Sequence, residues 1–117
     1  MGLTYIDARV TGSSGISQDI SLLVDSGASY SLLPFEVWSE LKLKPKRKVE
    51  FVLADGSKIF RNVSECHFII NDTDAHSPVI LGEEGDEALL GVITLENMGL
   101  VLDPFKRTLR NMHMKLS

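Results

Sequence analysis

The stretch Leu22-Leu23-Val24-Asp25-Ser26-Gly27-Ala28-Ser29 decides how this chain is interpreted. Residues 20–24 form an apolar run that predicts a strand buried on both faces. Asp25 follows this run directly, and a charged carboxylate there loses hydration unless hydrogen bonds compensate. Ser26 offers a hydroxyl group, while Gly27 and Ala28 offer backbone N–H groups with little steric bulk. These groups could hold the carboxylate in a fixed orientation while another backbone passes close by.

The tripeptide Asp25-Ser26-Gly27 has a simpler interpretation as well. Asp, Ser and Gly are the commonest residues of tight turns, so three such residues alone fit a turn more often than a reactive site. The apolar strand before them and the small Ala28 and Ser29 after them favour the second interpretation. Features elsewhere in the chain are needed to distinguish a simple turn from a reactive site.

Short alternating segments dominate the remaining sequence and predict strands. Asp55-Gly56 is typical of a two-residue hairpin between two of them. Pro34 favours a helix start, with Phe35, Trp38 and Leu41 on its packed face, and Gly99 favours the end of a second helix. The predicted strands cover residues 4–10, 20–24, 49–53, 58–63, 66–70, 79–81, 100–102 and 108–111, and the helices cover 35–41 and 93–98. This count predicts an all-β fold, a small closed barrel or sandwich with one or two short helices.

Two segments of the chain have a similar order of predicted elements. Residues 22–27 are an apolar strand with a small turn that precedes the helix at 35–41, and Leu89-Leu90-Gly91 precedes the helix at 93–98. Alone, this similarity is thin evidence for an internal repeat.

Length and composition indicate one globular domain over residues 1–117. The chain has 117 residues, of which 44% are hydrophobic and 24% charged, and we find no linker-like tract that would divide it. No apolar run approaches the 18 or so residues of a membrane span. We expect no membrane association.

The net charge and the cysteine content indicate which partners and which cellular compartment to expect. The net charge is −4, and the one basic run, residues 44–48, is short, so we expect a solvated connection there and no nucleic-acid partner. The single cysteine, Cys66, excludes an intrachain disulfide and suits a reducing compartment. The first residues lack the basic start and apolar stretch of a signal peptide, so we expect a cytoplasmic protein.

The sequence gives little support for another kind of catalytic site or for a metal site. A serine hydrolase needs a serine on a sharp turn near a histidine, but no G-x-S-x-G occurs, and His67, His76 and His113 are scattered. The acidic run at 83–87 lacks the spacing of a calcium loop and predicts a solvated loop. Cys66 has no partner for zinc or redox chemistry, and we expect it buried in a strand. We expect no metal and no cofactor.

Residues 24–29 resemble the hydrophobic-Asp-Thr/Ser-Gly-Ala/Ser motif of aspartic peptidases. The small size and single motif are similar to the retropepsin-like group, including its prokaryotic single-domain members. Leu89-Leu90-Gly91 resembles the later hydrophobic-hydrophobic-Gly motif, residues 95–104 resemble the helix and final strand region, and Asp55-Gly56 lies where such proteins carry a flap. The resemblance spans residues 20–110. The sequence departs from the family pattern at Ser26, where threonine is commoner. It also departs in the acidic run before Leu89, to which the resemblance assigns no role.

The resemblance implies a retropepsin-like aspartic endopeptidase that hydrolyses peptide bonds in peptide or protein substrates. Only one Asp-Ser-Gly tripeptide is present, so a homodimer would supply the second. Asp25 of each subunit would be catalytic. Ser26, Gly27, Ala28 and Gly91 would support the active site. The flap would contain Leu53, Ala54, Asp55, Gly56, Ser57, Lys58 and Ile59. The alternative is a catalytically silent, dimeric peptide-binding or regulatory module of the same fold.

Overall fold

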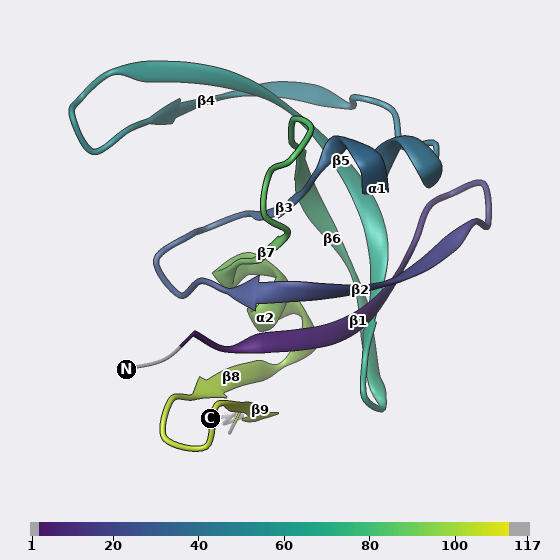
Figure 1. The fold of residues 1–117 in the computed structure, drawn as a ribbon, viewed down its shortest axis with the longest axis vertical. Coiled ribbons are helices and arrows are strands. Elements are labelled where there is room, and N and C mark those ends of the chain that lie inside the picture. The colour runs from purple at the N-terminus through teal and green to yellow at the C-terminus, as the bar shows by residue number, and fades with distance from the viewer. Residues whose placement is uncertain (1–2, 113–117) are drawn as a thin grey trace, which may run out of the picture.

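The structure, a computed structural model, describes residues 3–112 as a strand-rich body with two short helices (Figure 1). Within this range neither helix is long and apolar enough to cross a membrane. The elements in chain order are β1 (Tyr5–Thr11), β2 (Ser17–Val24), β3 (Ser31–Leu33), α1 (Phe35–Glu40), β4 (Arg47–Val52), β5 (Lys58–Ile70), β6 (Thr73–Leu81), β7 (Leu89–Leu90), α2 (Val92–Met98), β8 (Leu100–Asp103) and β9 (Thr108–Asn111).

Strand pairing closes most of the sheet into a ring. The order is β1-β2-β7-β3-β6-β5-β4, and β5 pairs again with β1, so six strands follow one another around the ring. β4 extends from β5 outside the ring, and β8 and β9 form a separate hairpin. The all-β prediction with two short helices is confirmed.

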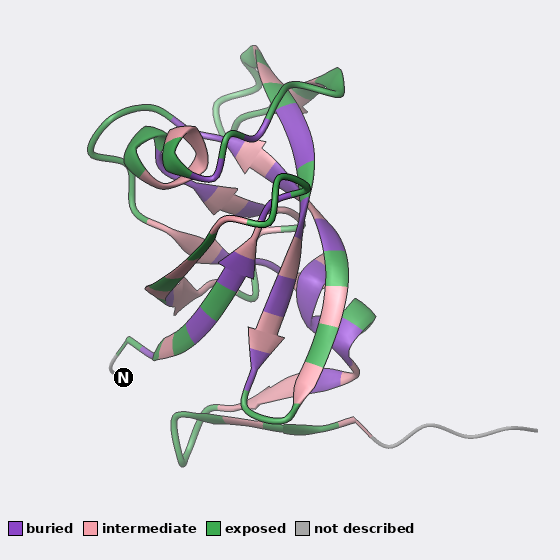
Figure 2. Cartoon of the chain, turned by 90° about the vertical axis from the view of Figure 1, so that its right-hand side faces the viewer, coloured by how far each residue is buried: buried purple, intermediate pink, exposed green. Residues whose placement is uncertain are grey.

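The interior of the ring is apolar. Buried and exposed residues alternate along the strands, as Figure 2 shows, because successive side chains of a strand point to opposite faces. Each fully buried aliphatic or aromatic side chain contributes about 1.5–3 kcal/mol to stability. The residues with no exposed surface include Val10, Leu22, Leu33, Leu41, Val63, Phe68, Val79 and Leu90.

β5 corrects one prediction, because the two strands expected at 58–63 and 66–70 are a single strand of 13 residues. The buried positions change from odd to even numbers at Val63 and Ser64, which are both buried. The pairing with β6 nevertheless continues without interruption, from Val63↔Ile80 to Ser64↔Val79. The strand therefore turns first one face and then the other toward the interior. Because the alternation of apolar residues is interrupted at this change, the sequence pattern predicts two strands instead of one.

Other differences concern polar or short segments. β6 begins at Thr73, earlier than expected, because its polar first half pairs with β5. β3 was not expected, and it separates the Asp25 loop from α1. β2 is not buried on both faces, since Ser21 is exposed and Leu23 half-buried. Leu41, which directly follows α1, is buried as expected, but Phe35 at the start of α1 is 39% exposed.

Candidate active site

Asp25 lies in a loop, residues 25–30, at the carboxyl end of β2. β2 runs parallel to β7, with Val24 beside Leu90, and the Asp25 N–H donates to the Leu90 carbonyl oxygen (3.0 Å). The two similar segments of the sequence are thus adjacent strands. This pairing fixes the point at which the chain leaves the sheet. It therefore also fixes the backbone position of Asp25, from which the side chain extends.

The loop itself orients the carboxylate. The Gly27 N–H donates to Asp25 Oδ1 (3.0 Å), and the Ala28 N–H donates to the Asp25 carbonyl oxygen (3.1 Å). A Cβ on Gly27 would lie 3.3 Å from Asp25 Oδ1, so glycine keeps this side of the carboxylate open. Asp25 is half-buried, whereas Ser26 and Gly27 are exposed. One face of the Asp-Ser-Gly turn is therefore open to another molecule.

Gly91, at the junction of β7 and α2, packs directly on this loop. A Cβ there would lie 2.5 Å from the Tyr30 carbonyl carbon and 2.9 Å from the Ser29 carbonyl oxygen. The next two N–H groups bind the loop, from Val92 to the Ala28 oxygen and from Ile93 to the Ser29 oxygen, both at 2.9 Å. Only a residue without a side chain allows this approach, and it holds the loop from behind.

A buried cluster of hydroxyl groups supports the same junction, and sequence reasoning missed it. The Gly91 N–H donates to Ser31 Oγ (2.9 Å), which lies 2.5 Å from Thr94 Oγ1. Thr94 Oγ1 lies 2.7 Å from Ser77 Oγ, and all three side chains are buried. These hydroxyls come from β3, α2 and β6, and no local motif joins them. They tie the start of α2 to the sheet.

The predicted flap region is the tip of the hairpin formed by β4 and β5. The Leu53 N–H donates to the Ser57 oxygen (2.8 Å), and the Gly56 N–H donates to the Leu53 oxygen (2.9 Å). The loop therefore has three residues, Ala54 to Gly56, and not the two expected, with Gly56 at φ +87°. Asp55 Oδ1 accepts from Ser57 Oγ (2.6 Å) and Ser57 N (2.9 Å), which lowers the pKa of Asp55 below its ordinary value. These bonds order the turn at the tip.

The hairpin has two different faces. Phe51 and Ile59 are cross-strand partners and are both half-buried, whereas Val52 and Phe60 on the opposite face are 65% and 57% exposed. In Figure 1 the hairpin projects from the ring on the side of the loop that follows β2. The side with Phe51 is therefore the one that faces the Asp25 loop.

Tyr30 connects that loop to strand β4 of the hairpin, and sequence reasoning missed this role too. Its ring packs edge-on against Phe51, with centroids 5.5 Å apart and an interplanar angle of 87°. Arg47 Nη2 donates to the Tyr30 hydroxyl oxygen (3.2 Å). Because the Tyr30 carbonyl also packs on Gly91, one residue links the carboxylate loop, the strand–helix junction and the flap.

The acidic loop at 82–87 has a structural use. The Glu83 N–H donates to Asp86 Oδ2 (2.7 Å), and the Gly85 N–H donates to Glu36 Oε1 on α1 (3.1 Å). Glu83 also forms an ion pair with Arg61 of β5 (3.8 Å). The loop therefore joins α1 to the flap strand. Within residues 3–112 no three His, Cys, Asp or Glu side chains form a metal-binding group.

His67 and His76 lie apart from Asp25, because His67 is paired with Thr11 at the opposite end of the β1–β2 strand pair. His67 on β5 and His76 on β6 are neighbours, with ring centroids 4.9 Å apart, and His67 Nε2 lies 2.6 Å from Asp74 Oδ2. This adjacency was not expected from their positions in the sequence. His113 lies outside the described residues.

The structure thus has an Asp-Ser-Gly loop that packs on a glycine at a strand–helix junction and contacts a hairpin, an arrangement similar to the one that the resemblance to aspartic peptidases implies. A comparison with known protein families agrees: the gag-polyprotein putative aspartyl protease family matches residues 15–97, more than half of the chain. The chain belongs to this family. The matched range includes Asp25, the flap hairpin and Gly91. The comparison with curated proteins found no match.

Proposed function

We propose that this protein is an aspartic endopeptidase whose active site forms between two copies of the chain. The observation that carries the proposal is the Asp25 carboxylate, which is held by the Gly27 N–H in a loop whose outer residues, Ser26 and Gly27, are exposed. Membership of an aspartyl protease family supports the reaction class.

The sequence contains one Asp-Ser-Gly tripeptide, so the second carboxylate must come from a second copy. A two-fold axis beside the exposed Ser26 would place two equivalent Asp25 loops face to face. Apolar surface is available next to them. Leu3 and Tyr5 are 65% and 48% exposed, and they flank Thr4, whose carbonyl oxygen accepts from the Val24 N–H (2.8 Å). A second copy would cover these side chains.

The chemistry follows from two facing carboxyl groups. At about 3 Å they share one proton, because both do not ionise readily at that separation. The ionised Asp25 takes a proton from water, whose oxygen attacks the peptide carbonyl carbon. The protonated Asp25 donates to the carbonyl oxygen. The resulting tetrahedral diol returns one hydroxyl proton to the carboxylate that had donated it, so that the carbonyl group re-forms as the C–N bond breaks. The proton taken from water passes to the leaving amine, and the two Asp25 carboxyl groups again hold one proton between them.

The other residues of the site have supporting roles in this proposal. Ser26 braces the two turns against each other, while Gly27 and Ala28 keep the approach to the carboxylates free of bulk. The flap tip, residues 53–59, closes over the bound peptide and excludes water. Gly91 keeps the loop in place through the close packing described above.

The proposal is tested by incubating a complex peptide mixture with the wild-type protein and with Asp25→Asn, between mildly acidic and neutral pH, and identifying products by mass spectrometry. A matched control is Asp72→Asn, which changes an exposed aspartate in the β5–β6 turn. We expect the same cuts from the wild type and from Asp72→Asn, and none from Asp25→Asn. Equal cutting by Asp25→Asn would contradict the proposal. No cutting by a confirmed dimer would favour the silent peptide-binding module.

A further inference from the structure

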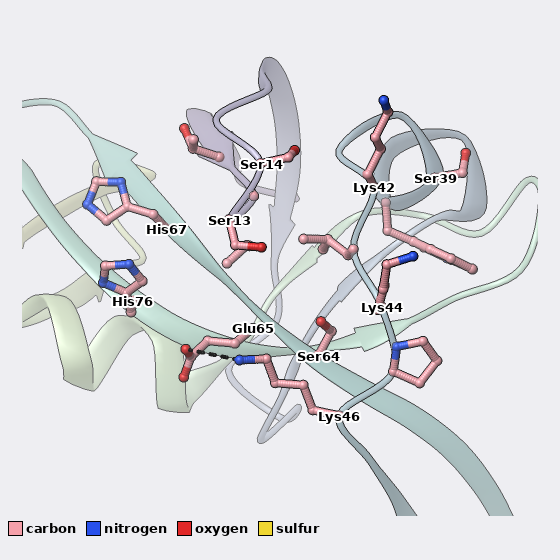
Figure 3. A pocket seen from close by; sticks show the side chains of 16 residues that line it. Ser13, Ser14, Ser39, Lys42, Lys44, Lys46, Ser64, Glu65, His67 and His76 are labelled. Atoms are coloured by element: carbon pink, nitrogen blue, oxygen red, sulfur yellow. Dashed lines mark ion pairs between the residues drawn. The ribbon is translucent and has the colours of Figure 1, made fainter.

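A concave site lies at the end of the β1–β2 strand pair that is opposite the Asp25 loop. Its volume is about 990 Å³, and its walls are the β1–β2 turn at 11–14, the end of α1 with residues 42–46, and residues 64–67 of β5 (Figure 3). We call it the lysine groove. Its lining includes no residue of the Asp25 loop and none of the flap tip.

The walls of the lysine groove are fixed against each other. A Cβ on Gly12 would lie 2.6 Å from the Leu41 carbonyl oxygen, so the β1–β2 turn packs directly on the end of α1. Ser14 Oγ also donates to the Leu41 oxygen (3.4 Å), and Leu43 is buried beside Gly12. The groove is therefore already formed without a ligand.

Its charge is opposite to that of the chain as a whole. Three lysines, Lys42, Lys44 and Lys46, line it together with one acid, Glu65, although the whole chain has a net charge of −4. Lys46 Nζ lies 3.9 Å from Glu65 Oε1. Neither Lys42 nor Lys44 forms an ion pair with any residue from 3 to 112. Two cations of the groove thus lack a partner in the described chain.

The segment that follows α1 brings the three lysines to the groove. Lys42 has a left-handed backbone conformation, with φ +57°, in the turn that ends α1. Pro45 favours an extended conformation at the preceding Lys44. Figure 3 shows Ser13 and Ser39 around the same opening, where hydroxyl groups can donate to carboxylates.

We propose that the lysine groove is a docking site for an acidic segment of a partner protein. Carboxylates of that segment pair with Lys42 and Lys44 and accept hydrogen bonds from the groove serines. Single-stranded nucleic acid is the poorer fit, because it requires aromatic stacking surfaces. Trp38 is half-buried, its indole N–H donates to the Gly82 oxygen (2.8 Å), and its ring packs on Phe35. The proposal does not depend on hydrolysis by Asp25.

Binding is measured by fluorescence anisotropy on the Asp25→Asn protein, so that failure of the proposed peptidase activity does not affect the result. The probe is a labelled peptide of four Glu-Gly-Ser repeats, compared with the same peptide carrying Gln in place of Glu. The test variant is Lys42→Glu/Lys44→Glu. The matched control is Lys48→Glu/Lys106→Glu, which makes the same charge change at two exposed lysines outside the groove.

We expect the test variant to bind the acidic peptide at least about tenfold more weakly, and the control less than about threefold. The Gln peptide should not bind, and binding should weaken with added salt, because ions screen such pairs. Equal loss in both double variants would overturn the proposal, since it would indicate a response to net charge alone. Tighter binding of oligothymidylate than of the peptide at the same salt concentration would overturn it in favour of a nucleic-acid site.

Discussion

The Thr94 hydroxyl stands between two buried serines beneath the Asp25 loop. Thr94→Val keeps the shape of the side chain but removes the hydroxyl group that bonds to both Ser31 Oγ and Ser77 Oγ. Ser77 Oγ can still donate to the Pro78 oxygen (3.2 Å), whereas Ser31 Oγ keeps only the bond from the Gly91 N–H. An unsatisfied buried polar group costs about 1–3 kcal/mol, so we expect the free energy of unfolding to fall by about 2 kcal/mol. Urea unfolding measures this change.

Thr108→Val is the matched control, because Thr108 is exposed on β9. Its stability should change by no more than about 0.5 kcal/mol. A similar small change for Thr94→Val would show that the hydroxyl cluster does not stabilise the junction at Gly91.

Cys66 gives a prediction about high pH. Burial, assisted by the negative charge of Glu65, raises the pKa of the Cys66 thiol from 9.0 to about 12. Between these two values the unfolded chain loses the thiol proton while the folded chain keeps it, so stability falls as pH rises and is unaffected well below pH 9. At pH 10 the loss should be about 1.4 kcal/mol.

The measurement is urea unfolding of the wild type and of Cys66→Ala at pH 7.5 and pH 10. The alanine variant has no thiol to ionise, so its stability should decline less between the two pH values. An equal decline in both proteins would mean that the folded thiol ionises normally. Other groups that titrate in this window are shared by the two proteins.

The residue scale also shows what sequence can predict about the site. Asp25, Ser26 and Gly27 are contiguous, so a local motif finds them. Gly91 is 66 positions from Asp25, and only the resemblance to a family connects the two. Ser31, Thr94 and Tyr30 carry no such signal, because a buried hydroxyl or a half-buried ring acquires its role from neighbours that folding brings together.

At the scale of elements, the two faces of the flap hairpin should differ in their effect on activity. Phe51→Ala removes the edge-on contact with Tyr30, and such aromatic pairs contribute about 0.5–1.5 kcal/mol beyond their buried area. We expect kcat/KM to fall about tenfold, mainly through KM, because the hairpin loses this link to the Asp25 loop. Steady-state kinetics on a peptide identified from the cleavage experiment measures this.

Phe60→Ala is the control for that prediction, since Phe60 lies on the exposed face of the same hairpin. Its kcat/KM should stay within about twofold of the wild type. Equal effects of the two variants would show that the contact with Tyr30 does not position the flap.

Elements themselves were predictable where one face stays buried throughout, as in β1 and α2. β5 was divided wrongly because its buried face changes at Val63 and Ser64 while its pairing continues. The first half of β6 was missed because its stability comes from pairing with β5 and not from apolar side chains. Pairing partners are a tertiary property, and the periodicity of one segment does not reveal them.

At the scale of the whole molecule, the described residues offer an Asp-Ser-Gly loop, the β4–β5 hairpin and an exposed apolar edge at Leu3 and Tyr5. Under the proposed function, each of these would be half of what a two-fold peptidase site requires. The same symmetry would give the dimer two lysine grooves, one on each chain and each remote from the shared site. Binding of an acidic segment and hydrolysis are therefore separable properties that can be tested independently.

Mixing subunits tests the shared site most directly. When a constant amount of wild type is mixed with an equal amount of Asp25→Asn and the subunits exchange, activity should fall to about half, and with a threefold excess to about a quarter. The reason is that only dimers with two Asp25 carboxylates are active. The control is Asp25→Asn/Tyr5→Asp, whose added charge at the exposed edge prevents pairing and should leave the activity of the wild type unchanged. Activity that stays constant at every ratio of Asp25→Asn, in a sample where mixed dimers are detected by native mass spectrometry, would mean that one chain contains the complete site.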